Sequence, residues 1–390
     1  LFMKDSSVSK NPALHRLGSR LRALALAGAV CVAAAALLCA PDAAGQGAAE
    51  GISTCLYTLI PSLFPFMVLC TYVTESGLAT RIGRFTGPVM RALFRLPGAA
   101  APVVLLGFIG GYPAGARGVS RLLARGEITR EEAGRMLCFC VGAGPPFVLT
   151  AVGSLLLGSA QAGPVLLLAV TASGLLLGLL LRFTSPKSAP KAAPKPQPPS
   201  SSPFVDSVTG AGRAMAVLCA FVIVFSVLLS LCRDAGLFRP LTRFLLLRGM
   251  GPGNAAALPS FLAEVTAGCR DGAQFGASLP LFAFGLGWGG LCVHLQIFSF
   301  FPQLPLSRWK FWLFRLLHGL GAAGLAWVLL PFFPEAAAAS TLWPEGVTGK
   351  TAASIPAAAA LFLLLLIMAL DGAQLLPLAK GKQNRAKNPR

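Results

Sequence analysis

The sequence LGFIGGYPAGAR, Leu106–Arg117, is too rich in glycine to form an ordinary membrane-spanning helix. It lies in a short apolar segment, Ala101–Gly115, in which four glycines and Pro113 interrupt the helical pattern. Arginines flank the segment on both sides, at 81–95 and at 117–135, and basic flanks are typical of the cytoplasmic side of a membrane. We therefore expect a re-entrant stretch that enters and leaves the bilayer on one side.

The composition of the whole chain indicates a polytopic membrane protein. Of its 390 residues, 55% are hydrophobic and only 12% are charged, whereas a soluble domain carries about 25% charged residues. This excludes a soluble enzyme, and the high hydrophobicity excludes a disordered chain. The net charge of +19 comes from lysines in the tails and one linker and from arginines beside apolar runs. That placement predicts contact with a lipid bilayer and no nucleic-acid binding.

A second broken stretch, Pro252–Gly268, repeats the pattern of the first. Gly115-Ala-Arg117 aligns with Gly268-Cys-Arg270, and the Gly/Pro-rich segment 142–146 aligns with 287–290. Each copy contains an odd number of spans, which inverts the second copy relative to the first. The sequence therefore predicts an all-α integral membrane protein with about eight transmembrane helices in two inverted-topology repeats, each with a re-entrant or broken segment.

The predicted segments follow this plan, with both termini and the linker in the cytoplasm. A cleaved signal peptide is the alternative for residues 21–40. In order, we expect a cytoplasmic tail (1–20), a first transmembrane helix (21–40), a first repeat (52–182), a Pro/Lys-rich linker (183–203), a second repeat (204–332), a last transmembrane helix (357–376) and a basic tail (377–390). Within the repeats, ordinary spans are expected at 136–157 and 164–181, a span interrupted by Pro61 and Pro65 at 52–74, and further spans at 215–231, 278–301 and 311–332.

Inverted repeats with broken segments at matching positions are typical of secondary transporters. A broken helix exposes backbone groups at membrane depth, which is tolerated where they line a cavity or bind a ligand. Half-helix N-termini also carry partial positive charge and suit an anion. The sequence therefore predicts a small anionic or heteroaromatic solute near the bilayer midplane.

Glu264 is the most informative single residue. A carboxylate at mid-depth costs on the order of 2.5–3.5 kcal/mol, so it should face a cavity, pair with a cation or carry a proton. The alternative is a structural pair with Arg270 or a side chain that reaches the membrane interface. Arg117 and Arg270 occupy matching positions and could hold an anion between them. The alternative for each arginine is to orient its span.

His294 and Gln296 are polar groups in an otherwise apolar span. Because residues two apart lie on different helix faces, both line one cavity only if the helix breaks near Gly289-Gly290. The alternative is a polar pair satisfied by neighbouring helices. The complete set of candidate substrate-binding residues is Gly111, Tyr112, Pro113, Gly115, Arg117, Gly144, Pro145, Glu264, Thr266, Gly268, Arg270, His294 and Gln296.

Catalytic and metal-binding patterns do not stand out in the sequence. The spans show no Ser/His/Asp, paired-Asp or His-Glu-x-x-His arrangement, so we assign no catalytic residue and no enzyme activity. The ten cysteines lack zinc-type spacing. We expect no cofactor and no metal, and a coupling ion, H⁺ or Na⁺, stays open, as does assembly into a homo-oligomer. Thr129 and Glu132 are expected to form a capping box that starts a helix.

The chain contains five motifs, in the order 107–117, 125–133, 142–146, 264–268 and 289–296. Together they resemble the nucleoside-recognition (Gate) membrane family, including its sporulation integral membrane proteins. The resemblance covers about 52–332 and implies a fold related to concentrative nucleoside transporters. Cys292 stands where the resemblance leads us to expect a small hydroxyl residue.

The same resemblance implies a role in endospore formation. Such a protein is expected to move dipicolinate, a planar aromatic dianion, out of the mother cell towards the forespore. The expected location is then a bacterial cell membrane, specifically the outer forespore membrane. Nucleosides or related heteroaromatics are the alternative cargo, and a non-transporting scaffold for spore-envelope assembly is the alternative function.

Overall fold

The computed structural model describes residues 34–76, 78–184 and 202–339, together with 27, 28 and 31. Every regular element in these ranges is a helix, which confirms the all-α class. The predicted tails (1–20 and 377–390) and the last transmembrane helix (357–376) lie outside the described residues. Half of the first predicted helix (21–40) and most of the linker (183–203) lie outside them too.

Within the described residues, five helical runs are long and apolar enough to cross a membrane. Their mean hydropathy lies between 1.5 and 2.8, so the chain is a multi-pass integral membrane protein. The total of about eight spans stays a prediction, because it includes helices outside the described part of the chain. The five runs are Pro41–Glu75, Ala162–Thr184, Pro203–Asp234, Leu279–Ser299 and Arg308–Phe332.

The first run is continuous but not uniform. It consists of α2 (Pro41–Thr54), a π-helical turn η1 (Cys55–Leu59) and α3 (Ile60–Glu75). The π turn comes directly before Pro61, which has no N–H to donate to the preceding turn. The run starts at Pro41, well before the predicted start at residue 52, because proline is favoured in the first turn of a helix.

The longest helix, α8 (Pro203–Asp234), packs along α2 and α3. Gly47 and Gly51 of α2 allow this close approach. A Cβ atom at Gly47 would lie 2.8 Å from the backbone of α8 at Ser226, and one at Gly51 would lie 2.8 Å from Ile223. Small residues spaced by four are the usual means by which membrane helices approach each other.

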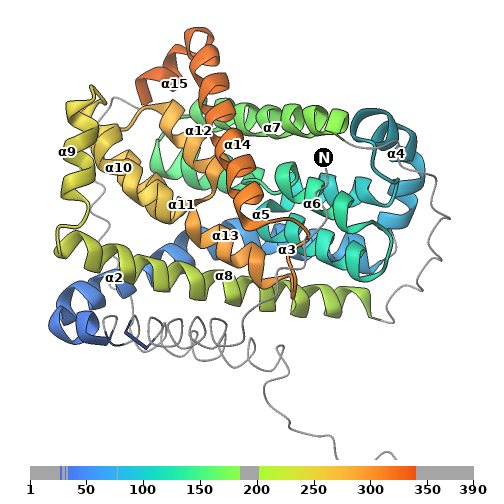
Figure 1. Ribbon diagram of the computed structural model, residues 1–390, viewed down its shortest axis with the longest axis horizontal. Coiled ribbons are helices and arrows are strands. Elements are labelled where there is room, and N and C mark those ends of the chain that lie inside the picture. The colour runs from blue at the N-terminus through green and yellow to red at the C-terminus, as the bar shows by residue number, and fades with distance from the viewer. Residues whose placement is uncertain (1–26, 29–30, 32–33, 77, 185–201, 340–390) are drawn as a thin grey trace, which may run out of the picture.

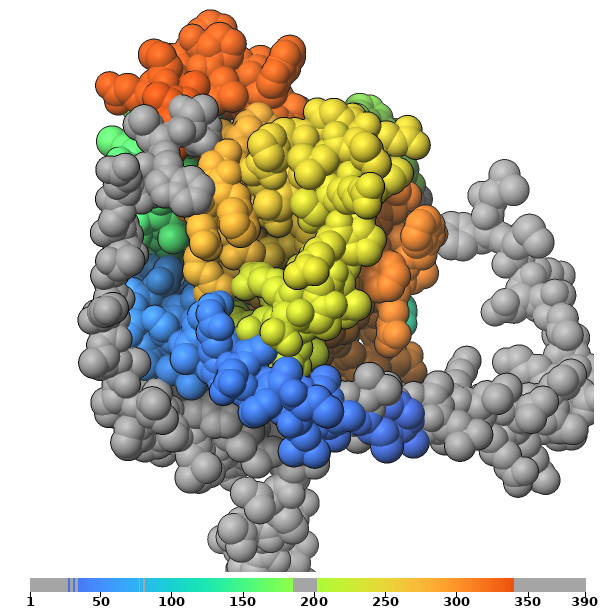
Figure 2. Space-filling model, turned by 90° about the vertical axis from the view of Figure 1, so that its left-hand side faces the viewer, coloured from blue at the N-terminus to red at the C-terminus, as the bar shows by residue number. Residues whose placement is uncertain are grey.

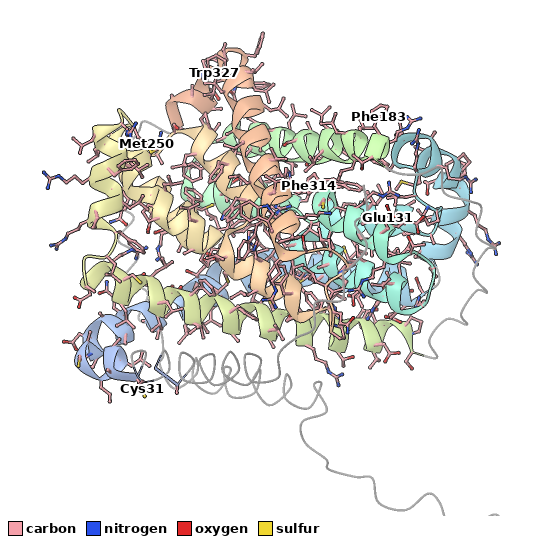
Figure 3. All side chains as sticks on the ribbon, in the orientation of Figure 1. Cys31, Glu131, Phe183, Met250, Phe314 and Trp327 are labelled. Atoms are coloured by element: carbon pink, nitrogen blue, oxygen red, sulfur yellow. The ribbon has the colours of Figure 1, made fainter. Side chains whose placement is uncertain are left out.

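The long helices enclose the broken ones. In Figure 1, α7 (Ala162–Leu181) and α8 run along opposite sides of the molecule, with the broken helices between them. The helix α14 (Arg308–Leu329) packs on α7 and α12. Its Trp327, 70% exposed, lies at the outer end in Figure 3. The short element η3 (Arg182–Thr184) follows α7, and the short elements η4 (Leu330–Phe332) and α15 (Pro334–Ala339) follow α14.

Two amphipathic helices lie at the two ends of the molecule in Figure 1, namely α4 (Leu78–Phe94) and α9 (Arg239–Leu247). No residue of α9 is buried, and Figure 2 shows this helix uncovered on the face towards the viewer. A short basic helix with an apolar face suits the membrane interface.

The first broken stretch is α5 (Ala100–Ala124), in which Gly111 has φ 80° and ψ −174°. Only glycine adopts this conformation readily, so the helix is interrupted where the sequence predicts. The next helix, α6 (Arg130–Phe139), begins with the predicted capping box of Thr129 and Glu132. Helical structure then stops for residues 140–144 and resumes at Pro145, directly before η2 (Pro146–Leu156).

The prediction of one continuous span at 136–157 is therefore wrong. Two adjacent prolines, Pro145 and Pro146, supply no N–H, and the residue before a proline avoids helical conformation. Local backbone chemistry thus prevails over an apolar pattern that is long enough to span.

The second half contains two further breaks. The helices α10 (Pro252–Ala263) and α11 (Val265–Phe275) are separated by Glu264, which is extended with φ −150° and ψ 125°. The helices α12 (Leu279–Trp288) and α13 (Gly290–Ser299) are separated at Gly289, with φ 84°. The predicted span at 278–301 coincides with the candidate span Leu279–Ser299, and its helix is interrupted where two successive glycines, Gly289 and Gly290, adopt positive φ.

Candidate functional site

The helix breaks surround one cavity that is open on one side, and its space free of protein atoms is about 490 Å³ with the solvent-open part included. Three of the four breaks line it directly, through Gly111, through Ala143 and Gly144, and through Glu264. Helix α13, which follows the fourth break at Gly289, contributes Val293 and Gln296. Apolar side chains of η1, α3, η2 and α8 complete the wall: Leu59, Leu63, Met67, Phe147, Leu218 and Val222.

The breaks touch each other in pairs within each half. A Cβ atom on Gly144 would lie 3.0 Å from the amide nitrogen of Gly111. In the second half, a Cβ atom on Gly290 would lie 3.0 Å from the Cα atom of Glu264. The backbone of one broken helix therefore packs directly on the backbone of the next at both places.

The sequence-predicted site residues divide into two groups. Those that line the cavity are Gly111, Tyr112, Pro113, Gly144, Glu264, Thr266 and Gln296. Those that do not line it are Gly115, Arg117, Pro145, Gly268, Arg270 and His294. Gly115 and Gly268 instead allow close packing, because Cβ atoms there would lie 2.4 Å from the Cys140 carbonyl oxygen and 2.5 Å from the Phe261 ring.

Glu264 is buried, with 1% of its surface exposed, and its carboxylate caps the N-terminus of α11. Oε1 accepts a hydrogen bond from the Thr266 amide at 2.9 Å and Oε2 accepts one from the Ala267 amide at 2.7 Å. The Thr266 hydroxyl also donates to Oε2. The positive end of this half-helix therefore stabilises the protein's own carboxylate, so these amides are not free for an anionic solute.

Arg270 does not pair with Glu264. Its Nη2 lies 2.7 Å from Oε2 of Glu50, and its Nε lies 3.9 Å from Oδ1 of Asp271. Arg233 of α8 binds the same two carboxylates, with its Nη2 at 2.5 Å from Oδ2 of Asp271. The guanidinium of Arg270 is thus part of a neutralised cluster that joins α2, α8 and α11.

Arg117 and Arg270 are not brought together on the cavity. Arg117 donates from Nη1 to the Gly210 carbonyl oxygen of α8 at 3.0 Å and lines a separate cavity. The hypothesis that the two arginines hold one anion between them stays a prediction, and the arrangement described here gives it no support.

His294 and Gln296 face different sides of α13, although the helix is broken at Gly289. Gln296 lines the cavity and its Nε2 contacts Cys292 Sγ at 3.3 Å. His294 is fully buried, with Nε2 at 2.9 Å from the Trp288 carbonyl oxygen. Its ring packs edge-on against Trp288 at 4.4 Å between centroids. His294 is therefore a packed polar residue that helps to shape the break.

Arg315 is a central residue that the sequence reasoning missed. It lies on α14 with no exposed surface. Its Nε donates to the Trp288 carbonyl oxygen at 3.4 Å, and its Nη1 and Nη2 donate to the carbonyl oxygens of Val141 and Gly287. One buried guanidinium thus binds backbone acceptors at the ends of α6 and α12, where helix dipoles favour a cation.

Tyr112 of α5 also contacts α12 and Arg315. Its hydroxyl donates to the Leu286 carbonyl oxygen of α12 at 2.5 Å, and the Arg315 guanidinium lies 6.0 Å from its ring centroid. Sequence reasoning could have found Arg315, because an ionisable residue within an apolar span is expensive unless it has a role. Only Glu264 was predicted to have a role on this ground.

With this geometry established, comparisons with known proteins agree with the sequence resemblance. Residues 56–156, which include the first broken stretch, match the family described as Gate, nucleoside recognition. The chain is therefore a multi-pass membrane protein in which residues 56–156 are similar to the Gate nucleoside-recognition family.

The chain is also similar to a named relative. It is 27% identical over 334 residues to the sporulation integral membrane protein YlbJ of Bacillus subtilis (strain 168), across 78% of this chain and 82% of that protein. It is thus a distant homologue of YlbJ over most of its length. No solved structure matches the chain.

Proposed function

We propose that the protein is a secondary carrier, not an enzyme, and that it moves a small heteroaromatic solute held in the cavity at the helix breaks. The observation that carries this proposal is the arrangement of broken helices around one cavity with a buried carboxylate, Glu264. Interrupted helices at membrane depth are used by transporters to present backbone groups to a solute.

The two halves of the chain support an inverted-repeat carrier. Each half has, in this order, a long helix, an amphipathic helix, two interrupted helical segments and a final long helix. In the first half these are α3, α4, α5, α6 with η2, and α7, and in the second α8, α9, α10 with α11, α12 with α13, and α14. Inverted halves can rock around a fixed site, which is the physical basis of alternating access.

The first candidate cargo is dipicolinate. The relative is named as a sporulation integral membrane protein, and we place this chain in the same process, at the outer forespore membrane of a bacterium with both termini in the cytoplasm. The apolar walls of the cavity, including Phe147 and Leu218, suit a flat aromatic ring.

The second candidate cargo is a nucleoside, and one observation favours it. The cavity is lined by the carboxylate of Glu264 and the polar groups of Thr266 and Gln296, with no arginine or lysine among its described lining residues. Such a lining suits a neutral solute with hydroxyl groups better than a dianion. The Gate description as nucleoside recognition agrees with this candidate.

Uptake into proteoliposomes tests both candidates. Wild-type protein is expected to take up labelled dipicolinate or labelled uridine, measured in parallel, with saturable kinetics. Glu264→Gln is expected to abolish uptake because it removes the charge at the cavity wall. Glu131→Gln, a matched change of an exposed carboxylate on α6, is expected to leave uptake unchanged. Uptake of neither solute by wild type would favour the scaffold instead.

A further inference from the structure

A second cavity lies next to the first and shares Met67 with it, and its space free of protein atoms is about 460 Å³ with the solvent-open part included. Its walls come from α3 and α5 and include Thr71, Thr74, Arg117 and Arg121. This cavity therefore differs from the first in chemistry, since arginines line it and no carboxylate does.

Arg117 forms no ion pair within the described part of the chain, although Glu75 acts on its charge from a longer distance. Its one hydrogen bond is to the neutral carbonyl oxygen of Gly210, and no carboxylate oxygen lies within 4.0 Å of its nitrogens. A guanidinium has five N–H donors, so most of them are unused. Arg117 is also partly buried, and a partly buried charge is stabilised when a counter-ion pairs with it.

Arg121 differs from Arg117 in being already paired. Its Nη1 lies 2.8 Å from Oε1 of Glu75 and 3.4 Å from the hydroxyl of Thr74. The two arginines and one carboxylate leave one net positive charge at the cavity.

The threonine hydroxyls add no free donors. Thr71 donates to the Met67 carbonyl oxygen at 2.8 Å, and Thr74 donates to the Thr71 carbonyl oxygen at 2.6 Å. The guanidinium groups are thus the donors available to a ligand, and such donors match the oxygens of a carboxylate or phosphate.

We propose that this second cavity binds an oxyanion, with Arg117 as the principal ligand and Arg121 shared between the oxyanion and Glu75. Val103, Leu106 and Ala114 provide an apolar wall for the ring or chain that carries the anion. The oxyanion is either the carboxylate of a soluble aromatic acid or the phosphate of a lipid headgroup. Binding here does not depend on transport through the first cavity.

The test measures binding to purified full-length protein in a neutral detergent. Labelled dipicolinate is titrated by equilibrium dialysis, and phosphatidylglycerol is titrated in parallel by native mass spectrometry. Arg117→Gln is expected to weaken binding of one probe about tenfold or more, because charge-assisted hydrogen bonds are lost. Arg213→Gln, which removes an exposed arginine of α8, is the matched control and is expected to bind as wild type does.

A gain of affinity provides the second arm. Glu75→Gln releases Arg121 and is expected to tighten binding of the same probe about threefold or more. Because misfolding does not tighten binding, this arm decides the matter even if Arg117→Gln fails to fold. An effect on dipicolinate alone identifies a soluble acid, and an effect on phosphatidylglycerol alone identifies a lipid. The proposal is overturned if Glu75→Gln tightens neither probe, or if a folded Arg117→Gln binds both as Arg213→Gln does.

Discussion

Single buried polar residues organise this protein. Glu264 and Arg315 both lie within the apolar interior, and neither has an ion-pair partner among the described residues. Each is satisfied by backbone groups at helix ends, Glu264 by amides and Arg315 by carbonyls. Opposite charges thus stabilise opposite helix ends, as the helix dipole requires.

Two substitutions of Glu264 separate its structural role from its proposed role in transport. Glu264→Ala removes the cap of α11 and is expected to cost about 1 kcal/mol of stability. Glu264→Gln keeps an acceptor for the cap and is expected to be closer to wild type in thermal stability, while both variants lose uptake. Thermal unfolding in detergent, followed by fluorescence, measures the first effect. Full uptake by both variants would remove Glu264 from the solute site.

Arg315→Met is expected to destabilise the protein strongly, by on the order of 3 kcal/mol, because buried carbonyl groups of Val141 and Gly287 lose their donor. Lys310→Met, an exposed change on the same helix, serves as the control and is expected to have little effect. The two variants are compared by their thermal unfolding midpoints. Equal midpoints would mean that Arg315 does not hold the helix ends together.

The elements show how far the sequence determines the breaks. Hydropathy and glycine content predicted the interrupted stretches at Gly111 and near Glu264, and the capping box at Thr129 was also predicted. The break at 140–144 was missed as an interruption of a span, whereas a break near Gly289-Gly290 was raised only as the condition for His294 and Gln296 to line one cavity. An apolar run of sufficient length is compatible with either a continuous or a broken helix, and backbone conformation at glycine and proline decides between them.

The site was predicted in part for a similar reason. Residues next to a break, such as Tyr112 and Thr266, line the cavity, because the break itself forms the wall. Arg117 and Arg270 were grouped by their matching sequence positions, yet each has a different local partner, Gly210 and Glu50. Which neighbour satisfies a long side chain depends on tertiary packing, and sequence spacing does not contain that information.

Gly111→Ala tests the importance of a break. The conformation of Gly111, with φ 80° and ψ −174°, is unfavourable for alanine by on the order of 1–3 kcal/mol, although the nearest atom to the new Cβ would be 3.5 Å away. Gly126→Ala is the matched control, since Gly126 also has positive φ (67°) and open space but lies in the α5–α6 loop. Both variants should lose stability, Gly111→Ala at least as much as Gly126→Ala, and only Gly111→Ala should lose uptake. Equal uptake by the two would separate the break from transport.

For the whole molecule, the proposed inverted repeat makes a prediction about sidedness. An odd number of crossings in each half places the segment 187–202, of which residues 187–201 lie outside the described residues, on the cytoplasmic side with both termini. Cysteines introduced into 187–202 should react with an impermeant thiol reagent only when the cytoplasmic face is accessible. Reaction from the outside of intact cells would rule out this topology.

Reversible chemical blocking of the first cavity tests directly whether the solute passes through it, as the carrier proposal requires. Val222 and Val224 lie on α8, but Val222 lines the cavity whereas Val224 is 54% exposed on the outer surface. Modification of Val222→Cys with a membrane-permeant, disulfide-forming reagent should stop uptake. A reductant should restore uptake and bound solute should protect the thiol, while Val224→Cys and the unsubstituted protein keep their uptake. If Val222→Cys is fully modified and still transports as before, the solute does not pass through this cavity.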